Sequence, residues 1–169
     1  YLLIAHIGAV GILLSFGVMA GNTGDYTFDA MRTFPPEGIW PTVAFLLALF
    51  GFGAKAGLLP LHVWLPEAHP AAPSPVSAIM SGVMLKTAIY GLLRVSFDLL
   101  HAQLWWWGAL LLVLGLATAL FGVIFATVQT DMKRLLAYSS IENIGLIVVG
   151  FGLTLIFKSF MLPTLAALA

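Results

Sequence analysis

Long apolar stretches alternate with short polar connections along this chain of 169 residues. A helix rises about 1.5 Å per residue, so about 20 apolar residues cross the roughly 30 Å hydrocarbon core of a bilayer. This pattern predicts membrane-spanning helices over residues 1–20, 39–65, 76–99, 104–128 and 135–157, and the start of another over 160–169. We therefore expect an all-α, polytopic transmembrane helix bundle in which residues 1–169 form a single transmembrane domain.

The second predicted span is longer than a straight crossing requires, and Gly57 and Pro60 interrupt it. Proline has no backbone donor and clashes with the preceding helical turn. Backbone groups that are freed at membrane depth must be satisfied by protein or water, because lipid offers no partner. We therefore expect a helix broken at Gly57 and Pro60, a device that recurs in transporters.

Prolines and tryptophans mark the ends of the next spans. Pro66, Pro70 and Pro73 predict a loop over Pro66–Ser74, and Pro75 suits the first turn of the helix that follows. The run Trp105–Trp107 opens the fourth span, where aromatic residues favour the membrane interface.

Glycines recur every seven residues on the fourth span, at Gly108, Gly115 and Gly122. Small residues along one stripe let a neighbouring membrane helix approach closely. The stripe predicts a helix-packing surface.

Composition agrees with a membrane location and excludes several function classes. The chain is 61% hydrophobic and 8% charged, with a mean hydropathy of +1.05, whereas soluble domains carry about a quarter charged residues. Seven basic residues balance seven acidic ones, which gives no sign of nucleic-acid binding. The absence of cysteine excludes thiol catalysis, disulfides and cysteine-bound iron–sulfur clusters on this chain. Because the first residue is Tyr1 and no charged region precedes the first span, we expect an internal fragment of a longer protein.

Two lysines lie inside otherwise apolar spans, at Lys55 and Lys86. Lys86 follows Pro75 by eleven residues, which places it about 16 Å into the membrane core. Lys55 immediately precedes the expected break, where carbonyl groups and water can solvate an ammonium. An ionisable residue at membrane depth is a candidate functional site, and dehydration favours the uncharged form of a lysine. The pair predicts a proton or ion path.

The structural alternative is that each lysine pairs with a carboxylate of an adjacent helix. No carboxylate lies one turn from Lys86, where Tyr90 offers a hydroxyl, so any partner must come from another helix. Glu142 is one candidate partner, or a proton-relay group, although a carboxylate facing water near a helix entry is an equal alternative. His62 is a candidate relay group beside the break, because histidine titrates near neutral pH. We expect His69 to hold the following loop.

Several segments resemble the signature of antiporter-like membrane subunits, the family found in respiratory complex I, Mrp antiporters and energy-converting hydrogenases. They are GAKAGLLPLHVWLPEAH at 53–69, APSPVS at 72–77, LKTAIYGLLR at 85–94 and QTDMKRLLAYSSI at 129–141. The LKTA sequence favours the chain-M-like branch. SIENIG at 140–145 departs from the Ser-His-Met-Gly type usual in complex I, and resembles the large membrane subunit of formate hydrogenlyase and hydrogenase-4.

The resemblance implies roles for particular residues. In that family a lysine on a broken helix carries the pumped proton, and Lys55 stands at its motif position. Lys86 matches the lysine that links this group to a central water path. The family's partner glutamate and the charged residue that passes the proton onward would lie on helices outside this sequence.

We therefore expect a proton-translocating subunit of a redox-driven complex, acting through a relay of Lys55, Lys86, His62 and Glu142. Its expected partners are the bilayer and the membrane and peripheral subunits of a hydrogenase or dehydrogenase. We expect a multi-pass protein of the inner (plasma) membrane, without a cofactor, metal or catalytic residue on this chain. One alternative is an Mrp-type cation/proton antiporter subunit, and another is a membrane scaffold that transports nothing.

Overall fold

A computed structural model of the protein describes residues 2–21, 23–100, 104–160 and 167. Within these ranges the elements are helical, in the order α1 (Leu2–Ala20), α2 (Phe28–Thr33), α3 (Trp40–Ala56), η1 (Leu61–Val63), α4 (Trp64–Ala71), α5 (Ser74–Ile79), η2 (Met80–Met84), α6 (Leu85–Leu93), η3 (Arg94–Leu99), α7 (Trp105–Val128) and α8 (Met132–Ser159). η1 is a 3-10 turn, whereas η2 and η3 are π-helical segments.

Five helical runs are long and apolar enough to cross a membrane: Leu2–Ala20, Trp40–Ala71, Ser74–Leu99, Trp105–Val128 and Met132–Ser159. The predicted all-α, polytopic bundle is confirmed. The third and fifth runs begin a few residues before the predicted positions 76 and 135, and the second extends beyond position 65. Most of the helix start predicted over 160–169 falls outside the described residues.

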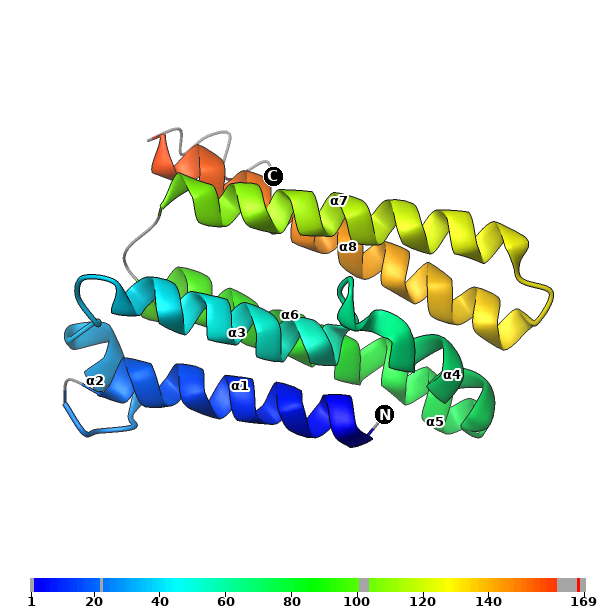
Figure 1. Cartoon of the computed structure of the whole chain (residues 1–169), viewed down its shortest axis with the longest axis horizontal. Helices are drawn as coiled ribbons and strands as arrows, with labels where there is room; N and C mark the ends of the chain where they lie inside the picture. The colour runs from blue at the N-terminus through cyan, green and yellow to red at the C-terminus, as the bar shows by residue number, and fades with distance from the viewer. Residues whose placement is uncertain (1, 22, 101–103, 161–166, 168–169) are drawn as a thin grey trace.

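The long helices lie side by side along one axis (Figure 1). α1 packs against α3, α7 pairs with α8, and α6 contacts both α3 and α8. Close approach of α1 and α3 depends on Gly51, where an added Cβ would lie 2.6 Å from the carbonyl oxygen of Gly8. α4 and α5 lie at one end of the bundle, and α2 lies at the other.

The glycine stripe of α7 faces α8, as its spacing predicts. A Cβ at Gly108 would lie 2.6 Å from the Gly152 carbonyl oxygen, and one at Gly115 would lie 2.8 Å from the Val149 amide nitrogen. At Gly122 the added atom would lie 2.7 Å from the amide nitrogen of Glu142. Backbone atoms therefore meet along the whole α7–α8 contact, a spacing that larger residues would prevent.

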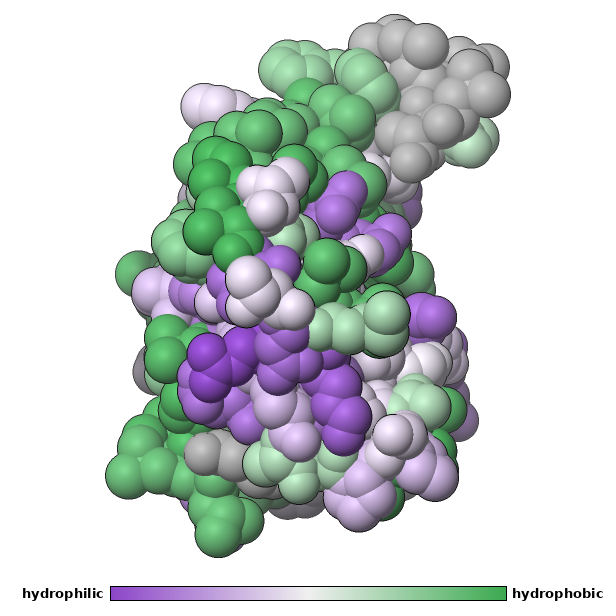
Figure 2. Space-filling model, turned by 90° about the vertical axis from the view of Figure 1, so that its right-hand side faces the viewer, coloured by the Kyte–Doolittle hydropathy of each residue, from purple (hydrophilic) through white to green (hydrophobic). Residues whose placement is uncertain are grey.

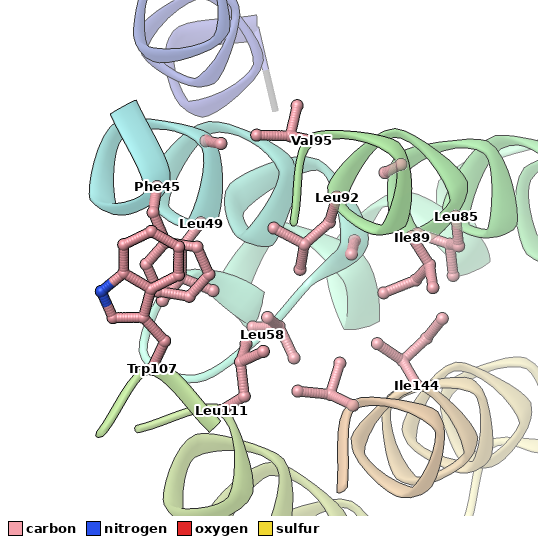
Figure 3. Packing of buried hydrophobic residues seen from close by; sticks show 14 of the residues in the cluster. Phe45, Leu49, Leu58, Leu85, Ile89, Leu92, Val95, Trp107, Leu111 and Ile144 are labelled. Atoms are coloured by element: carbon pink, nitrogen blue, oxygen red, sulfur yellow. The ribbon is translucent and has the colours of Figure 1, made fainter. Parts of the chain in front are cut away.

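The hydrophobic core lies between α3, α6, α7 and α8 (Figure 3). The two largest fully buried side chains, Phe45 and Trp107, stack with ring centroids 4.4 Å apart and planes 2° from parallel. The interface location of Trp105–Trp107 stays a prediction; within the protein, Trp107 is fully buried and Trp105 is exposed. Packing against Phe45 thus buries the whole Trp107 ring inside the bundle.

The predicted loop over Pro66–Ser74 is also wrong, because Trp64–Ala71 forms helix α4. Pro66 lies in the first turn of α4, where backbone N–H groups have no partner within the helix. Pro70 stands one residue from the end, so its missing donor affects the last turn alone. His69 lies in α4, and its Nδ1 is 2.6 Å from the Ser77 hydroxyl of α5. This bond confirms that His69 holds the connection between the two helices.

Charged side chains fasten the start of α8 to this end of the bundle. Asp131 caps α8 by accepting a hydrogen bond from the Lys133 amide at 2.9 Å. Lys133 Nζ donates to the Ala72 carbonyl at 2.9 Å, and Arg134 pairs with Glu67 at 3.2 Å. Figure 2 looks onto this end, where hydrophilic residues gather near the centre of the view.

A second ionic cluster lies at the opposite end. Arg32 on α2 donates to both carboxylate oxygens of Asp98, at 2.9 and 2.7 Å, and Arg94 reaches the same carboxylate at 3.1 Å. Hydrogen bonding to Asp98 raises the pKa of Arg32 above its ordinary value. The cluster ties the connection between α1 and α3 to η3, a role that the sequence alone did not assign to Asp98.

Candidate functional site

The predicted break lies between α3 and η1. α3 ends at Ala56, and Gly57 takes the left-handed conformation with φ of 79°. The amides of Gly57 and Leu58 both donate to the Gly53 carbonyl, the second at 2.9 Å, which closes the last turn. The backbone angle favours glycine, and a Cβ at Gly57 would also lie 2.5 Å from Leu65 Cδ1, so that side chain would have to shift. The break at Gly57 and Pro60 is thereby confirmed.

Two buried side chains satisfy backbone groups that the break frees. The Thr118 hydroxyl of α7 accepts a hydrogen bond from the Leu59 amide at 3.2 Å. The Trp64 indole Nε1–H donates to the Ala54 carbonyl at 2.9 Å, in the last turn of α3. Thr118 is 0% exposed and Trp64 is 5% exposed, so water does not compete for either bond. These are the protein partners that a helix break at membrane depth requires.

Lys55 stands one residue before the end of α3, beside the break. Its side chain lines a cavity of about 80 Å³ together with Ala5, Ala54, Trp64 and Met84. The other four lining residues carry no ionisable side chain. Within the described part of the chain, no ion pair or side-chain hydrogen bond involves Lys55. Its charge is therefore not part of an ion pair among these residues.

Lys86 lies midway along the Ser74–Leu99 run, two residues after the π segment η2. Single-turn π segments inside helices are frequent at functional sites. Lys86 lines a cavity of about 490 Å³ that also exposes Ser81 and, from α8, Ser140 and Asn143. The cavity gives the ammonium polar neighbours at the depth where the sequence places it. Among the described residues Lys86, like Lys55, has no ion pair.

The other two predicted relay residues lie elsewhere around the same helices. His62 in η1 meets Phe121 of α7 edge-on, with ring centroids 4.5 Å apart, and its buried Nδ1 has no hydrogen-bond partner among the described residues. Glu142 is half-buried on the α7-facing side of α8, where its backbone contacts Gly122. No hydrogen bond or ion pair among the described residues joins any two of Lys55, Lys86, His62 and Glu142. Any transfer between them therefore needs intervening water or another group.

Sequence reasoning missed three residues of this region. Asn143, next to the predicted Glu142, is the α8 residue that shares the Lys86 cavity, and its Nδ2 donates to the Ser139 carbonyl at 2.8 Å. A helical wheel starting from the buried positions of α8 could have separated Asn143 from Glu142. Thr118 and Trp64 complete the break, but neither carries a local signal for that role. The described residues hold no group of three or more histidine, cysteine, aspartate or glutamate side chains that could bind a metal.

Comparison with known proteins gives a consistent family signal over the whole chain. The family model described as "NADH:quinone oxidoreductase/Mrp antiporter, TM" matches residues 1–166. Hydrogenase-4 component B of Escherichia coli (strain K12) is 48% identical over 168 residues, which is 98% of this chain. The chain spans 25% of the length of that relative.

Solved structures of two kinds of complex contain a similar fold. A chain of the Mrp complex from Dietzia sp. DQ12-45-1b matches 99% of this chain with a TM-score of 0.79 and 27% identity. A chain of respiratory complex I from Thermus thermophilus matches 98% with a TM-score of 0.72 and 30% identity. This chain covers 33% and 36% of those two chains, respectively.

Proposed function

The chain belongs to the NADH:quinone oxidoreductase/Mrp antiporter transmembrane family, and from this premise we propose that its protein translocates protons as the membrane subunit of a redox-driven complex. The complex is of the energy-converting hydrogenase type, because the hydrogenase-4 component shares 48% of the aligned residues. On this proposal Lys55 binds and releases the transported proton, and Lys86 exchanges it through water. His62 and Glu142 extend the path on either side of α7.

One observation carries the proposal: Lys55 lines a cavity beside a helix break whose freed backbone groups are hydrogen-bonded by Thr118 and Trp64. A charge at membrane depth costs several kcal/mol unless it is hydrated, paired or neutral. Lys55 has no ionic partner among the described residues, so loss of its proton is a direct way to lower that cost. A lysine that alternates between the two forms is a proton carrier.

Electron transfer, on this proposal, takes place on other subunits. The sequence holds no cysteine that could ligate an iron–sulfur cluster, so we assign no cofactor to this chain. Its partners are then the membrane and peripheral subunits of a hydrogenase or dehydrogenase, and its location is the inner (plasma) membrane. This chain supplies the transport step that uses their redox energy.

The fold also supports a second candidate, a subunit of an Mrp-type cation/proton antiporter, because the Dietzia Mrp chain matches with a TM-score of 0.79. The two candidates differ in what drives transport. A redox-coupled subunit moves protons when electrons flow and needs no sodium. An antiporter subunit moves protons when a sodium gradient is applied and needs no electron donor.

Purified complexes, isolated through a tag on the full-length protein and sealed into vesicles, distinguish these candidates. We expect proton uptake that starts with the redox substrate, stops with an inhibitor of electron flow and proceeds without sodium. Uptake driven by a sodium gradient in the absence of electron flow would establish the antiporter instead. A complex that turns over its redox substrate and moves no proton under either condition would leave the chain a scaffold.

A further inference from the structure

The carbonyl group of Ala54 lies in the last turn of a helix that ends inside the membrane. The last four carbonyl groups of a helix have no partner from their own helix. Gly53 receives the amides of Gly57 and Leu58, and Ala54 receives the indole of Trp64 at 2.9 Å. The Trp64 bond spans the break, because Trp64 follows it and Ala54, ten residues earlier, precedes it.

This bond lies at the edge of the Lys55 cavity. Ala54 and Trp64 both line that cavity, and Ala54 directly precedes Lys55. A helix-terminal carbonyl with no donor is a strong acceptor for an ammonium, because both the lone pair and the helix dipole favour positive charge there. In this structure the indole N–H already bonds to the Ala54 oxygen, which makes that oxygen a weaker acceptor for a second donor.

We propose that Trp64 is a positioning residue that sets the proton affinity of Lys55 by competing with its ammonium group for the Ala54 carbonyl oxygen. On this proposal the indole N–H of Trp64 weakens an acceptor that would otherwise favour the charged form of Lys55. Lys55 is left to cavity water, from which a proton passes on. The inference rests on the proposed function, since it concerns how readily Lys55 releases the transported proton.

Among the described residues, five other acidic, basic or histidine side chains lie on the elements around the cavity. On α1, His6 is exposed and its Nδ1 is 2.7 Å from the Leu2 carbonyl oxygen. On α4, Glu67 pairs with Arg134 and His69 bonds to Ser77. His62 of η1 contacts Phe121. Lys86 follows the lining residue Met84 by two positions, so its side chain leaves the helix about 200° away from that of Met84. None of these side chains lines the cavity, and the Ala54 carbonyl is the acceptor beside it that loses its donor when the Trp64 indole N–H is removed.

The test is the pH dependence of redox-driven proton uptake by the assembled complex in sealed vesicles. Trp64→Phe removes the N–H and keeps an aromatic ring. A freed carbonyl stabilises the ammonium, so the pH of the half-maximal rate on the alkaline side rises by about one unit. Trp40→Phe is the matched control, because Trp40 begins the same helix and is exposed, and its pH profile stays at that of wild type.

A second variant removes the N–H group with almost no change of shape, by placing benzothienylalanine at position 64. It decides the question if Trp64→Phe does not assemble, and we expect the same alkaline displacement. A lower maximal rate with an unchanged or acid-displaced half-maximum in the benzothienyl variant would overturn the proposal, since a packing role alone predicts that result. Lys55→Ala in the same vesicles separates the two claims. Pumping that survives Lys55→Ala overturns the proposed function, whereas pumping lost in Lys55→Ala together with unshifted Trp64 variants overturns this inference alone.

Discussion

Thr118→Val is the most specific perturbation of the helix break. The valine side chain has the shape of threonine but cannot accept the hydrogen bond from the Leu59 amide, which measures 3.2 Å. Thr118 also donates to the Leu114 carbonyl at 2.6 Å, within its own helix. That carbonyl already belongs to the helical ladder of α7, so the Leu59 amide is the group left without a partner.

Two free energies bear on how much Thr118→Val destabilises the break. Side-chain hydrogen bonds between membrane helices are worth about 0.6 kcal/mol on average and about 1.7 kcal/mol at most, because the separated helices find other partners. A buried donor that is left unsatisfied costs about 1–3 kcal/mol. The second range applies here, because Leu59 lies in the break, where no helical ladder accepts its amide. We therefore expect a loss of about 1–3 kcal/mol, which corresponds to a 5- to 150-fold larger opening equilibrium.

Hydrogen exchange measures this opening at the site itself. In the purified full-length protein, peptides that contain Leu59 should lose protection by that factor in Thr118→Val. Thr127→Val is the control, because Thr127 is exposed near the end of the same helix and donates to the Ile124 carbonyl alone, at 2.8 Å. Equal protection of the Leu59 amide in the two variants would refute the argument that Thr118 satisfies the break.

Three further predictions concern other contacts. Gly122→Ala should destabilise the α7–α8 pair by about 1–3 kcal/mol in detergent unfolding, because the new Cβ lies 2.7 Å from the Glu142 amide nitrogen. Gly82→Ala is the control and should leave stability nearly unchanged, because a Cβ at Gly82 meets nothing within 4 Å. Equal stability of the two variants would contradict the close backbone contact. Asp98→Asn should lower the melting temperature at low salt, and the difference should shrink at high salt as screening increases; a salt-independent difference would contradict an ionic role. Asn143→Leu should slow proton uptake while redox turnover continues, because it replaces an amide of the Lys86 cavity with an apolar group, and unchanged uptake would remove Asn143 from the path.

The break and the glycine stripe could be predicted because their causes are local or periodic. Gly57 and Pro60 disrupt a helix through their own backbones, whatever packs around them. Glycines spaced by seven residues fall on one helix face before any neighbour is known. The structure then adds the neighbours, α8 for the stripe and Thr118 for the break.

The partners that complete the break could not be predicted from the sequence. Thr118 lies 59 residues beyond Leu59, and a single threonine in an apolar helix most often bonds to its own backbone. Trp64 gives no sign that its indole turns back across the break to Ala54. Both contacts depend on tertiary packing, as does the burial of Trp107 against Phe45.

The membrane depth of the candidate site could be predicted from the sequence, but the contacts of its residues could not. Hydropathy places Lys55 and Lys86 inside the membrane without any structure, since charge within an apolar span is conspicuous. Which α8 residue faces Lys86 depends on the rotation of that helix, which the contact with Gly122 fixes. Glu142 consequently lies toward α7, and Asn143 lines the cavity.

The central claim is that Lys55 carries the transported proton, and the number of protons moved per electron pair tests it most directly. The measurement compares wild type with Lys55→Ala in vesicles that hold equal amounts of assembled complex, with Lys158→Ala as the control. Lys158 lies at the end of α8, where its Nζ is 5.7 Å from the centre of the Phe97 ring. We expect redox turnover in all three, with the proton ratio near zero in Lys55→Ala and at the wild-type value in Lys158→Ala. A wild-type ratio in Lys55→Ala would contradict the account.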